Sequence, residues 1–516
     1  MIKMNGTIHR TQVAALACAA LLFATGCDSL LEVDLPDAVT EEALDNPATA
    51  ALQVNSVAAS FECAYSSFAI MAAGHEDNFQ RYIGVAGNYA QYVSQPGLGT
   101  CDGSVFSTQW VAPLLIARGQ GYTSWVDIQS YSIANKERLL AKLAFYNAAT
   151  LAVFGEYFCE FAIGGGPLLT PGQTLAIAEG WADSALAQID AAVGPGGTFA
   201  INTQQGDVTL DIRQTVLGLR SRIRYANGDL PGAAADASAV ADNHMAWVLR
   251  ESGEDRRNMV SSTQGFGGGT PAGGFLQGAV ALEGGGRTYW ISALGSHPVA
   301  GTPYASGWPS PVPFTGYIDL AIETANGRAV SDAGHALTLA DPGTEQDTRV
   351  EHVIGSTGGG QDYIIQKYTS LEDDIPLINW REMRLIEAEA AGNTQAGIDL
   401  VNAIRTADGL PGIGTGADTS YRDALLADAE LYDDMIIEER RRALWLEGRF
   451  WSTKIQKNEK LWFPRAVGEW VNPIATNALG GGVRVILPNS EYSINTNLSL
   501  DDRGTGCPPG EAPVVS

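Results

Sequence analysis

The densest group of residues that could do chemistry lies in residues 431–451, near the end of the chain. Apolar side chains recur there in steps of three, four and seven, which predicts one long helix ending near Gly448. Glu439 falls on this apolar stripe, and an ionised carboxylate that faces a core needs a cation or hydrogen-bond donors around it. The charges could form an active site, a solvated helix surface or a buried polar cluster that joins several helices. We favour the buried cluster and assign a structural role to Glu439, Arg440, Glu447, Arg381 and Arg405.

No familiar catalytic or metal-binding motif accompanies these charges. The sequence has no Gly-x-Ser-x-Gly elbow, no His-Glu-x-x-His, no paired Cys-x-x-Cys and no EF-hand loop. His75, Glu76 and Asp77 could supply metal ligands, but a polar loop is the better interpretation because three consecutive side chains rarely converge on one ion. We therefore expect no catalytic residue, no metal site and no cofactor. A glycosidase stays open as an alternative, because it needs only two suitably placed carboxylates.

Aromatic residues in Gly/Pro-rich segments are the second candidate for chemistry. A sugar ring presents apolar C–H faces that stack on aromatic planes, while nearby Asp, Asn and Arg side chains bond its hydroxyl groups. The alternative is that each aromatic residue only pins its own loop to the protein. The residues that we nominate for ligand binding are Asp77, Tyr82, Trp110, Tyr289, Trp290 and Trp308.

The N-terminus has the pattern of a secretory signal peptide. Lys3 and Arg10 precede an apolar run over residues 13–24, which is too short to span a bilayer, and Thr25-Gly26-Cys27 follows. Small residues directly before a cysteine predict lipoprotein processing, with Cys27 as the acylated first residue after a signal peptide of residues 1–26. Each buried CH₂ of an acyl chain contributes about 0.8 kcal/mol, so several chains would anchor the protein firmly. Ordinary cleavage to a free periplasmic protein is the alternative.

Composition excludes several classes of protein. The chain is 45% hydrophobic, which is too apolar for general disorder, and 59 Gly with 23 Pro indicate many ordered loops. The net charge of −26 would repel nucleic acid and anionic lipid headgroups, so we expect no nucleic-acid partner.

Four cysteines besides Cys27 remain in the mature chain, and an oxidising compartment favours disulfides. Four cysteines allow three complete pairings, and sequence alone cannot choose among them. Our preferred pair is Cys63 with Cys101, because both precede the main helical block and could join the ends of an N-terminal loop.

Paired helices with Gly-Asn or Gly-Asp turns predict a scaffold similar to tetratricopeptide units, in which each pair needs a neighbouring pair to cover its apolar face. The expected helices are 46–71, with Asn46 as its cap, then 136–158, 175–193, 211–225, 231–242, 380–390 and 396–406. The alternating runs 288–291 and 363–368 are expected to form short strands or extended loops. The expected domain is 27–516, divided into an extended leader at 27–45, a scaffold at about 46–252 and 370–516 that carries an aromatic loop at 72–127, and a loop-rich lobe at about 253–369.

Taken together and in order, several short motifs resemble the SusD/RagB family of nutrient-binding outer-membrane lipoproteins. The resemblance covers nearly the whole mature chain. It departs from the family pattern at Ala443 and at Ser452-Thr453. The motifs are Gly26-Cys27 with residues 30–36, residues 143–155 with Gly166-Pro167-Leu168, Asp347-Thr348-Arg349, Gln366-Lys367-Tyr368, residues 381–390 with Asn402, Arg405 and Gly409-Leu410, Glu438-Glu439-Arg440, Glu447-Gly448-Arg449, and residues 486–488 with Glu491 and Asn495.

The resemblance implies a mainly α fold in which tetratricopeptide-like pairs face a loop-rich ligand lobe. It also implies a protein without enzymatic activity that is lipid-anchored in the outer membrane and exposed at the cell surface. Such a protein would capture oligosaccharides and deliver them to a TonB-dependent, SusC-like transporter that it covers as a lid. A peptide-capturing member of the same family is one alternative. A structural or adaptor envelope lipoprotein without a small ligand is another.

Overall fold

The structure is a computed structural model that describes residues 46–75, 111–202, 209–253, 256–263, 349, 352–356, 361–410, 412–415, 419–457, 470–471, 478–479, 484–487 and 489–506. Met1–Thr49 and Ala50–Ser516 are two separate compact units. In the first unit, Asn46 Oδ1 accepts a hydrogen bond from the Ala48 amide at 2.9 Å and begins a short 3-10 helix, Pro47–Thr49. The elements described below belong to the second unit.

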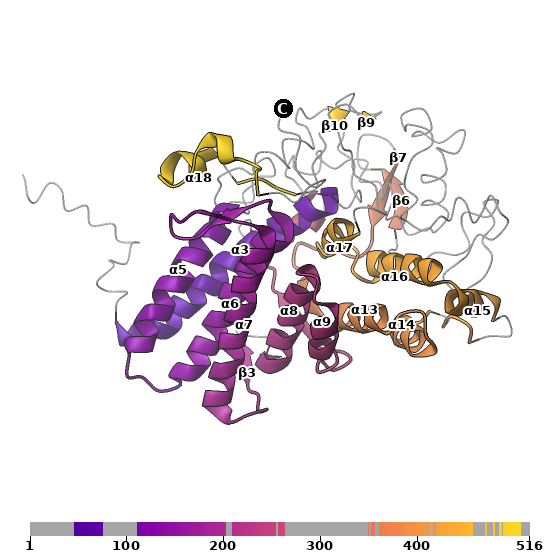
Figure 1. The fold of residues 1–516 in the computed structure, drawn as a ribbon, viewed down its shortest axis with the longest axis horizontal. Helices are drawn as coiled ribbons and strands as arrows, with labels where there is room; N and C mark the ends of the chain where they lie inside the picture. The colour runs from indigo at the N-terminus through magenta and orange to yellow at the C-terminus, as the bar shows by residue number, and fades with distance from the viewer. Residues whose placement is uncertain are drawn as a thin grey trace, which may run out of the picture. The chain divides into compact units, whose positions relative to one another are not determined.

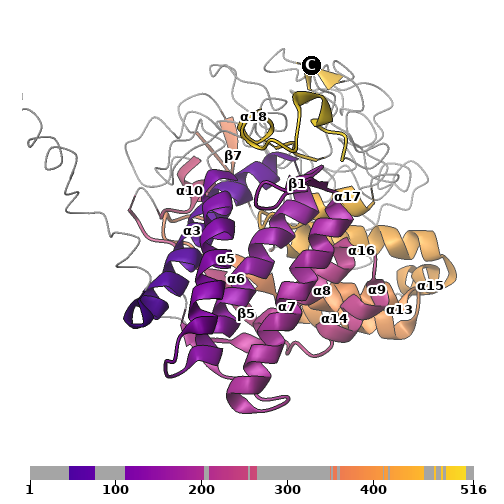
Figure 2. The same ribbon diagram turned by 60° about the vertical axis from the view of Figure 1, so that its left-hand side comes forward.

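Consecutive helices pack against each other in pairs. Helix α6 packs on α7, α8 on α9, and α13 on α14, and contacts of α7 with α8 and of α9 with α13 join the pairs. Figures 1 and 2 show these helices side by side. The main helices are α3 (Ala50–His75), α5 (Val111–Ser130), α6 (Lys136–Tyr157), α7 (Pro171–Val193), α8 (Ile212–Ala226), α9 (Leu230–Ala237), α13 (Trp380–Ala391), α14 (Gln395–Ala407), α15 (Ser420–Ala427), α16 (Ala429–Ala443) and α17 (Phe450–Gln456). Two short helices, α10 (Met259–Thr263) and α18 (Asn489–Ile494), complete the set in the described residues.

Small residues and polar caps explain why these pairs form. A Cβ at Gly155 would lie 2.6 Å from the Leu175 side chain, so glycine is what allows α6 and α7 to approach so closely. Thr170 and Gln173 form a capping box at the start of α7, and Asp211 caps α8 by accepting from the Gln214 amide. These caps satisfy amides that the first turn of a helix leaves unbonded.

The described strands form antiparallel two-stranded sheets. These are β1 (Phe161–Ala162) with β2 (Leu168–Leu169), β3 (Ala200–Asn202) with β4 (Thr209–Asp211), β5 (Met245–Val248) with β8 (Ile375–Asn379), β6 (His352–Ser356) with β7 (Gln361–Ile365), and β9 (Trp470–Val471) with β10 (Ala478–Leu479). The β5–β8 pair matters most for the site, because it joins residues about 130 positions apart in the sequence and packs beside α8 and α13.

The prediction of a mainly helical scaffold is confirmed. The helices predicted at 136–158, 175–193, 211–225, 380–390 and 396–406 appear within a few residues of those limits. The helix predicted at 231–242 ends earlier, at Ala237. The strand predicted at 363–368 corresponds to β7, which lies slightly earlier, and the strand predicted at 288–291 lies outside the described residues.

The aromatic loop predicted at 72–127 is partly wrong. Helix α3 continues to His75, and α5 begins at Val111 and runs through the last third of the predicted loop. The sequence of α5 concealed it, because two glycines interrupt its helical pattern. Gly121 has a packing role: a Cβ there would lie 2.3 Å from Asn147 Oδ1 on α6, and Asn147 Nδ2 donates to the Gly121 carbonyl at 3.1 Å.

The single helix predicted at 431–451 is also wrong. Helix α16 ends at Ala443, and α17 begins at Phe450 after a turn at residues 444–449. Leu446 has φ +61° and Gly448 has φ +74°, so the chain leaves the helical conformation twice. Gly448 adopts a left-handed conformation, which suits a residue without Cβ, and a Cβ there would lie 2.7 Å from the Phe68 ring.

Aromatic rings hold the turn in place. Phe68 of α3, Tyr157 of α6 and Trp451 of α17 are buried, and the Tyr157 ring centroid lies 4.8 Å from that of Phe68 and 4.7 Å from that of Trp451. This cluster joins an early helix to a late one, so the core closes only when the C-terminal part of the chain has docked.

Cys63 and Cys159 are both disulfide-bonded. Residues 55, 62 and 68 of α3 contact residues 142, 146 and 157 of α6, in the same order, so these two helices run parallel. Cys63 precedes Phe68 by five residues, about 7.5 Å along the helix, whereas Cys159 follows Tyr157. The two cysteines are therefore too far apart to bond each other, since bonded cysteines have Cα atoms within about 7 Å.

The surroundings of each cysteine indicate its partner. Helix α5 turns back through the short 131–135 connection, so it runs antiparallel to α3, and Ser56 contacts Gln120. Cys63 thus lies toward the start of α5 at Val111. In the sequence, Cys101 precedes Val111 by ten residues. At the other cysteine, the Gly506 amide donates to Glu160 Oε2 at 2.8 Å, so the residue that precedes Cys507 in the sequence lies beside the residue that follows Cys159.

We predict that Cys63 pairs with Cys101 and that Cys159 pairs with Cys507. Proteolytic mapping of the unreduced mature chain by mass spectrometry should find these two linked peptides, and both should disappear from a reduced control. A peptide linking Cys63 to Cys159 or to Cys507 would contradict the helix arrangement described above.

Candidate functional site

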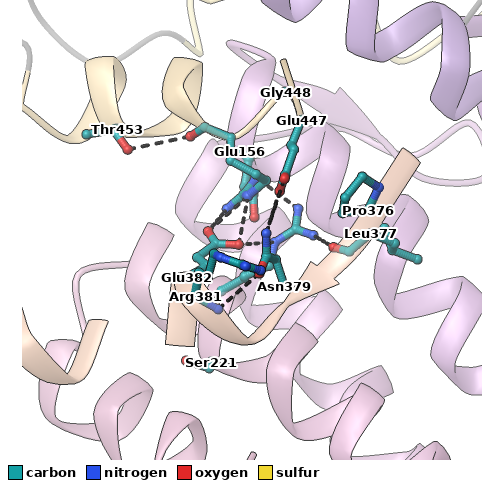
Figure 3. A network of polar contacts seen from close by, with 12 residues as sticks. Glu156, Ser221, Pro376, Leu377, Asn379, Arg381, Glu382, Glu447, Gly448 and Thr453 are labelled. Atoms are coloured by element: carbon teal, nitrogen blue, oxygen red, sulfur yellow. Dashed lines mark hydrogen bonds and ion pairs between the residues drawn. The ribbon is translucent and has the colours of Figure 1, made fainter. Parts of the chain in front are cut away.

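The 444–449 turn receives hydrogen bonds from three distant segments. Tyr157 donates to the Gly448 carbonyl at 2.8 Å, and Lys367 Nζ donates to the Trp445 carbonyl at 2.5 Å and to Glu447 Oε1 at 2.8 Å. Asn379 Nδ2 lies 3.1 and 3.0 Å from the two carboxylate oxygens of Glu447 (Figure 3). Because the helix breaks here, the carbonyls of Trp445 and Gly448 and the buried carboxylate of Glu447 are available to accept these hydrogen bonds.

Four buried charged residues lie at this turn, and one of them, Arg449, is its last residue. Arg449 Nη2 lies 2.8 Å from Glu382 Oε1, and its Nη1 contacts Glu156 Oε2. Arg222 lies 3.5 Å from Glu156 and 3.9 Å from Glu382 through its Nη2 and Nε atoms. Figure 3 shows the two carboxylates close together. We call Glu156, Arg222, Glu382 and Arg449 the central ion cluster; each residue is at most 2% exposed.

The central ion cluster contains two carboxylates and two guanidinium groups, so its negative and positive charges are equal in number. Burial acts to raise the pKa of Glu382, but the positive charges of Arg449 and Arg222 outweigh it and hold that pKa below its usual value. Burial acts to lower the pKa of Arg449, and the carboxylates of Glu156 and Glu382 raise it well above its usual range. These shifts favour the charged forms of Glu382 and Arg449, and the residues of the cluster depend on one another to offset the cost of leaving water.

Glu439 forms a second buried cluster. Arg405 Nη1 and Arg349 Nη1 each lie 2.6 Å from one of its carboxylate oxygens, and Glu439 is 4% exposed. Burial acts to raise its pKa, but Arg349 and Arg405 together lower it to about 2. The carboxylate therefore joins α16 to α14 and to residue 349 as a permanent anion.

The structure separates the residues that the sequence grouped together. Only Glu439 and Arg405 contact each other; Arg440 pairs with Glu389 at 2.9 Å, and Arg381 pairs with Asp408. The sequence interpretation missed Glu156, Arg222 and Glu382. One available signal was that these charged residues interrupt otherwise apolar stripes of predicted helices.

A β-bulge connects the central ion cluster to a cavity. Ala246 pairs with Ile378 and Trp247 with Pro376, so three positions of β8 oppose two of β5 and the register shifts between Ala246 and Trp247. In the bulged part of β8, the Leu377 carbonyl accepts from Arg222 Nη1 at 2.5 Å (Figure 3). The same arginine thus binds both carboxylates of the cluster and the backbone of the bulge.

The cavity has a volume of about 580 Å³ and lies against this bulge. One wall consists of Met245, Trp247, Pro376 and Asn379 from β5 and β8. Along β5, Ala246 and Val248 are buried, whereas Met245 and Trp247 are half-buried and face the cavity. The register shift at the bulge therefore determines which residues of β5 and β8 line the cavity.

Charged residues form most of the rest of the wall, together with Gln366, Tyr368 and Ala443. Lys367, Tyr368, Asp373 and Asp374 come from the segment after β7, and Glu447 comes from the 444–449 turn. Arg349, Arg381 and Asp408 complete the charged lining. A mixed lining of this kind suits a polar ligand that also has an apolar face, because a few placed polar groups then orient it.

The structure does not test the ligand residues nominated from sequence. Asp77, Tyr82, Trp110, Tyr289, Trp290 and Trp308 lie outside the described residues, as does Cys27. The sequence interpretation did not nominate Trp247, Asp373 or Asp374. The available signal was the alternation of Met245-Ala-Trp-Val248, which places a tryptophan on the outward face of a strand.

We predict that Glu439→Ala lowers the free energy of unfolding by roughly 3–5 kcal/mol, because it leaves Arg349 and Arg405 buried without their shared carboxylate. Urea unfolding of the mature chain would measure the change. Asp183→Ala is the matched control, since Asp183 is 54% exposed and pairs with Arg220 at the surface; its loss should cost about 1 kcal/mol or less. A Glu439→Ala protein that is fully stable but binds no ligand would refute the structural role.

Comparison with known proteins supports the fold. No family model matches the sequence, and neither does any curated protein. Among solved structures, a SusD-like carbohydrate binding protein from Bacteroides vulgatus is 14% identical with a TM-score of 0.52, over 89% of this chain and 98% of that one.

Two further solved structures are similar to the same extent. A SusD-like protein from Bacteroides fragilis is 12% identical with a TM-score of 0.50, over 89% of this chain and 98% of that one. A SusD superfamily protein from Parabacteroides distasonis is 13% identical with a TM-score of 0.50, over 90% and 99%. The chain therefore has the SusD-like fold, with paired helices as its scaffold.

Proposed function

We propose that this protein is a cell-surface lipoprotein of the SusD/RagB family that captures oligosaccharides and delivers them to a TonB-dependent, SusC-like transporter. The observation that carries the proposal is the shared fold with the Bacteroides vulgatus protein, which is described as carbohydrate binding and aligns over 89% of this chain. Fold alone does not specify function, so the proposal also needs support from the site.

The positions of the family-like motifs support the proposal. Arg349, Lys367, Tyr368, Arg381 and Glu447 belong to four motifs that are separate in the sequence, and all five line the same cavity. Motifs that matched by chance would have no reason to converge on one place. Their convergence argues that the sequence resemblance and the structural resemblance have a common cause.

The chemistry of binding would be stacking combined with hydrogen bonds. Trp247 is half-buried in the cavity wall and offers an aromatic surface, while the surrounding carboxylates, guanidinium groups and amides can bond hydroxyl groups. The loop residues nominated from sequence would add contacts of the same kind. An acidic protein of net charge −26 suits neutral or cationic ligands better than anionic ones.

The anchoring part of the proposal rests on the N-terminal sequence. Acylated Cys27 would hold the protein on the outer membrane, and the transporter would lie beneath it. Among the described helices, none combines the length and the apolar character that crossing a membrane requires.

We predict that the mature chain, made with Cys27→Ser so that it is not acylated, binds at least one glycan of a diverse panel in isothermal titration calorimetry. Product analysis of the same samples should find each glycan intact, because the protein binds without breaking a bond. Turnover that a single carboxylate substitution abolishes would instead establish a glycosidase.

Two further results would change the proposal. Binding to peptides with no response to any glycan would assign the peptide-capturing role. Affinity capture from the outer membrane that recovers no transporter, using the acylated protein, would contradict delivery to a transporter and support the adaptor role.

A further inference from the structure

The cavity beside the β5–β8 bulge has an uneven charge balance. Three of its cations are already paired: Lys367 with Glu447 at 2.8 Å, Arg381 with Asp408, and Arg349 with Glu439 at 2.6 Å. Each of these cations therefore already has a carboxylate partner, which weakens its attraction for an incoming anion. The cavity is therefore poorly suited to a phosphate, a sulfate or an acidic sugar.

Two carboxylates of the lining are not paired in this way. Asp373 Oδ2 accepts from the amides of Thr369 and Ser370 at 2.6 and 2.8 Å, and Asp374 Oδ1 accepts from the Arg250 amide at 2.7 Å. In the described part of the chain, neither carboxylate forms an ion pair, and both side chains are half-buried. Each keeps one oxygen, Asp373 Oδ1 or Asp374 Oδ2, that meets no donor there.

Partial burial makes the ionised form of Asp374 less favourable. Burial raises the pKa of Asp374 above its usual value. A positively charged ligand group would offset that cost, because a carboxylate and an ammonium group attract each other more strongly where water is partly excluded.

Trp247 and the two carboxylates line the same cavity. Trp247 pairs with Pro376 in the β5–β8 sheet, and Asp373 and Asp374 directly precede β8, which begins at Ile375. The cavity thus combines an indole surface with two carboxylates that form no ion pair in the described residues.

We propose that this cavity binds an amino sugar, with the ring face against Trp247 and the ammonium group between Asp373 and Asp374. The proposal rests on the proposed function, since it takes the ligand to be a glycan and names the class of sugar. The volume of about 580 Å³ falls in the range of small-ligand sites. The described lining residues come from the helical scaffold, its strands and the segments next to them.

The test is calorimetry of the full mature Cys27→Ser chain with two ligands of equal length, a glucosamine hexasaccharide and its fully N-acetylated form. Acetylation removes the ammonium charge and keeps the ring. The free-amine form should bind at least tenfold more tightly, and its affinity should fall as salt rises, because salt screens the ion pair. Equal affinity for the two ligands, or no binding of the free-amine form, would overturn the proposal.

Three variants separate the contributions of the side chains. Asp374→Asn keeps an oxygen acceptor for the Arg250 amide, so its melting temperature should not change, yet its affinity for the free-amine ligand should fall at least tenfold. Trp247→Ala should lower the affinity for both ligands. Glu372→Gln is the matched control, because Glu372 is an exposed neighbour outside the cavity lining, and it should bind as the parent does. An Asp374→Asn protein with unchanged affinity would overturn the assignment.

Other outcomes distinguish this proposal from the proposed function. Binding of neutral glycans without binding of the glucosamine hexasaccharide would overturn the amino-sugar site and leave glycan capture standing. Failure to bind any glycan would overturn both. A lysine-containing peptide that binds more tightly than the hexasaccharide and depends on Asp374 would show that the ammonium group belongs to a peptide, which also overturns the sugar assignment.

Discussion

The cost of burying charge is the constraint on which the rest of this structure depends. The central ion cluster takes one residue each from α6, α8, α13 and the turn before α17, and none of them is more than 2% exposed. A charge buried without its partners is strongly destabilising, so these four segments must meet in the folded protein. Residues 156 and 449 are almost 300 positions apart, and their contact joins the first half of the scaffold to the last.

The central ion cluster also shapes the cavity. Arg222 reaches past the two carboxylates to the Leu377 carbonyl in the bulged part of β8. Arg449 lies immediately after Glu447 and Gly448, so its pairing holds the turn that presents Glu447 to Lys367 and Asn379. Both walls of the cavity are therefore attached to the same four charges. This arrangement explains how the family-like motifs of the turn and its partners fix the walls of the cavity.

The sequence predicted well the parts of the fold whose signals are local. Helix α6 has a continuous apolar stripe and α8 has a capping aspartate, and both were predicted nearly to the residue. Helix α5 was missed, because the glycine that looks like a loop signal at position 121 is required by contact with Asn147. The end of α16 was missed as well, since residues 444–447 continue a helical pattern and only tertiary hydrogen bonds to the turn favour the break.

The candidate site was harder to predict for the same reason. Glu439 could be recognised as a buried anion from its own helix, and Arg405 was a plausible partner. Trp247 and Asp374 carried no motif, because what makes them neighbours is the pairing of two strands far apart in sequence and one extra residue in β8. Such a register shift leaves no trace in the periodicity of a five-residue strand, so the cavity could be identified only from the structure.

A crystal structure of the Arg222→Lys variant would test most directly whether the central ion cluster sets the cavity. Lysine keeps the positive charge but cannot reach Glu156, Glu382 and the Leu377 carbonyl together, because it lacks the planar fork of donors. The account predicts that the bulge at Leu377 relaxes and that Trp247 moves out of the cavity wall. A variant that keeps Met245 opposite Asn379 and Trp247 opposite Pro376, with the cavity unchanged, would contradict it.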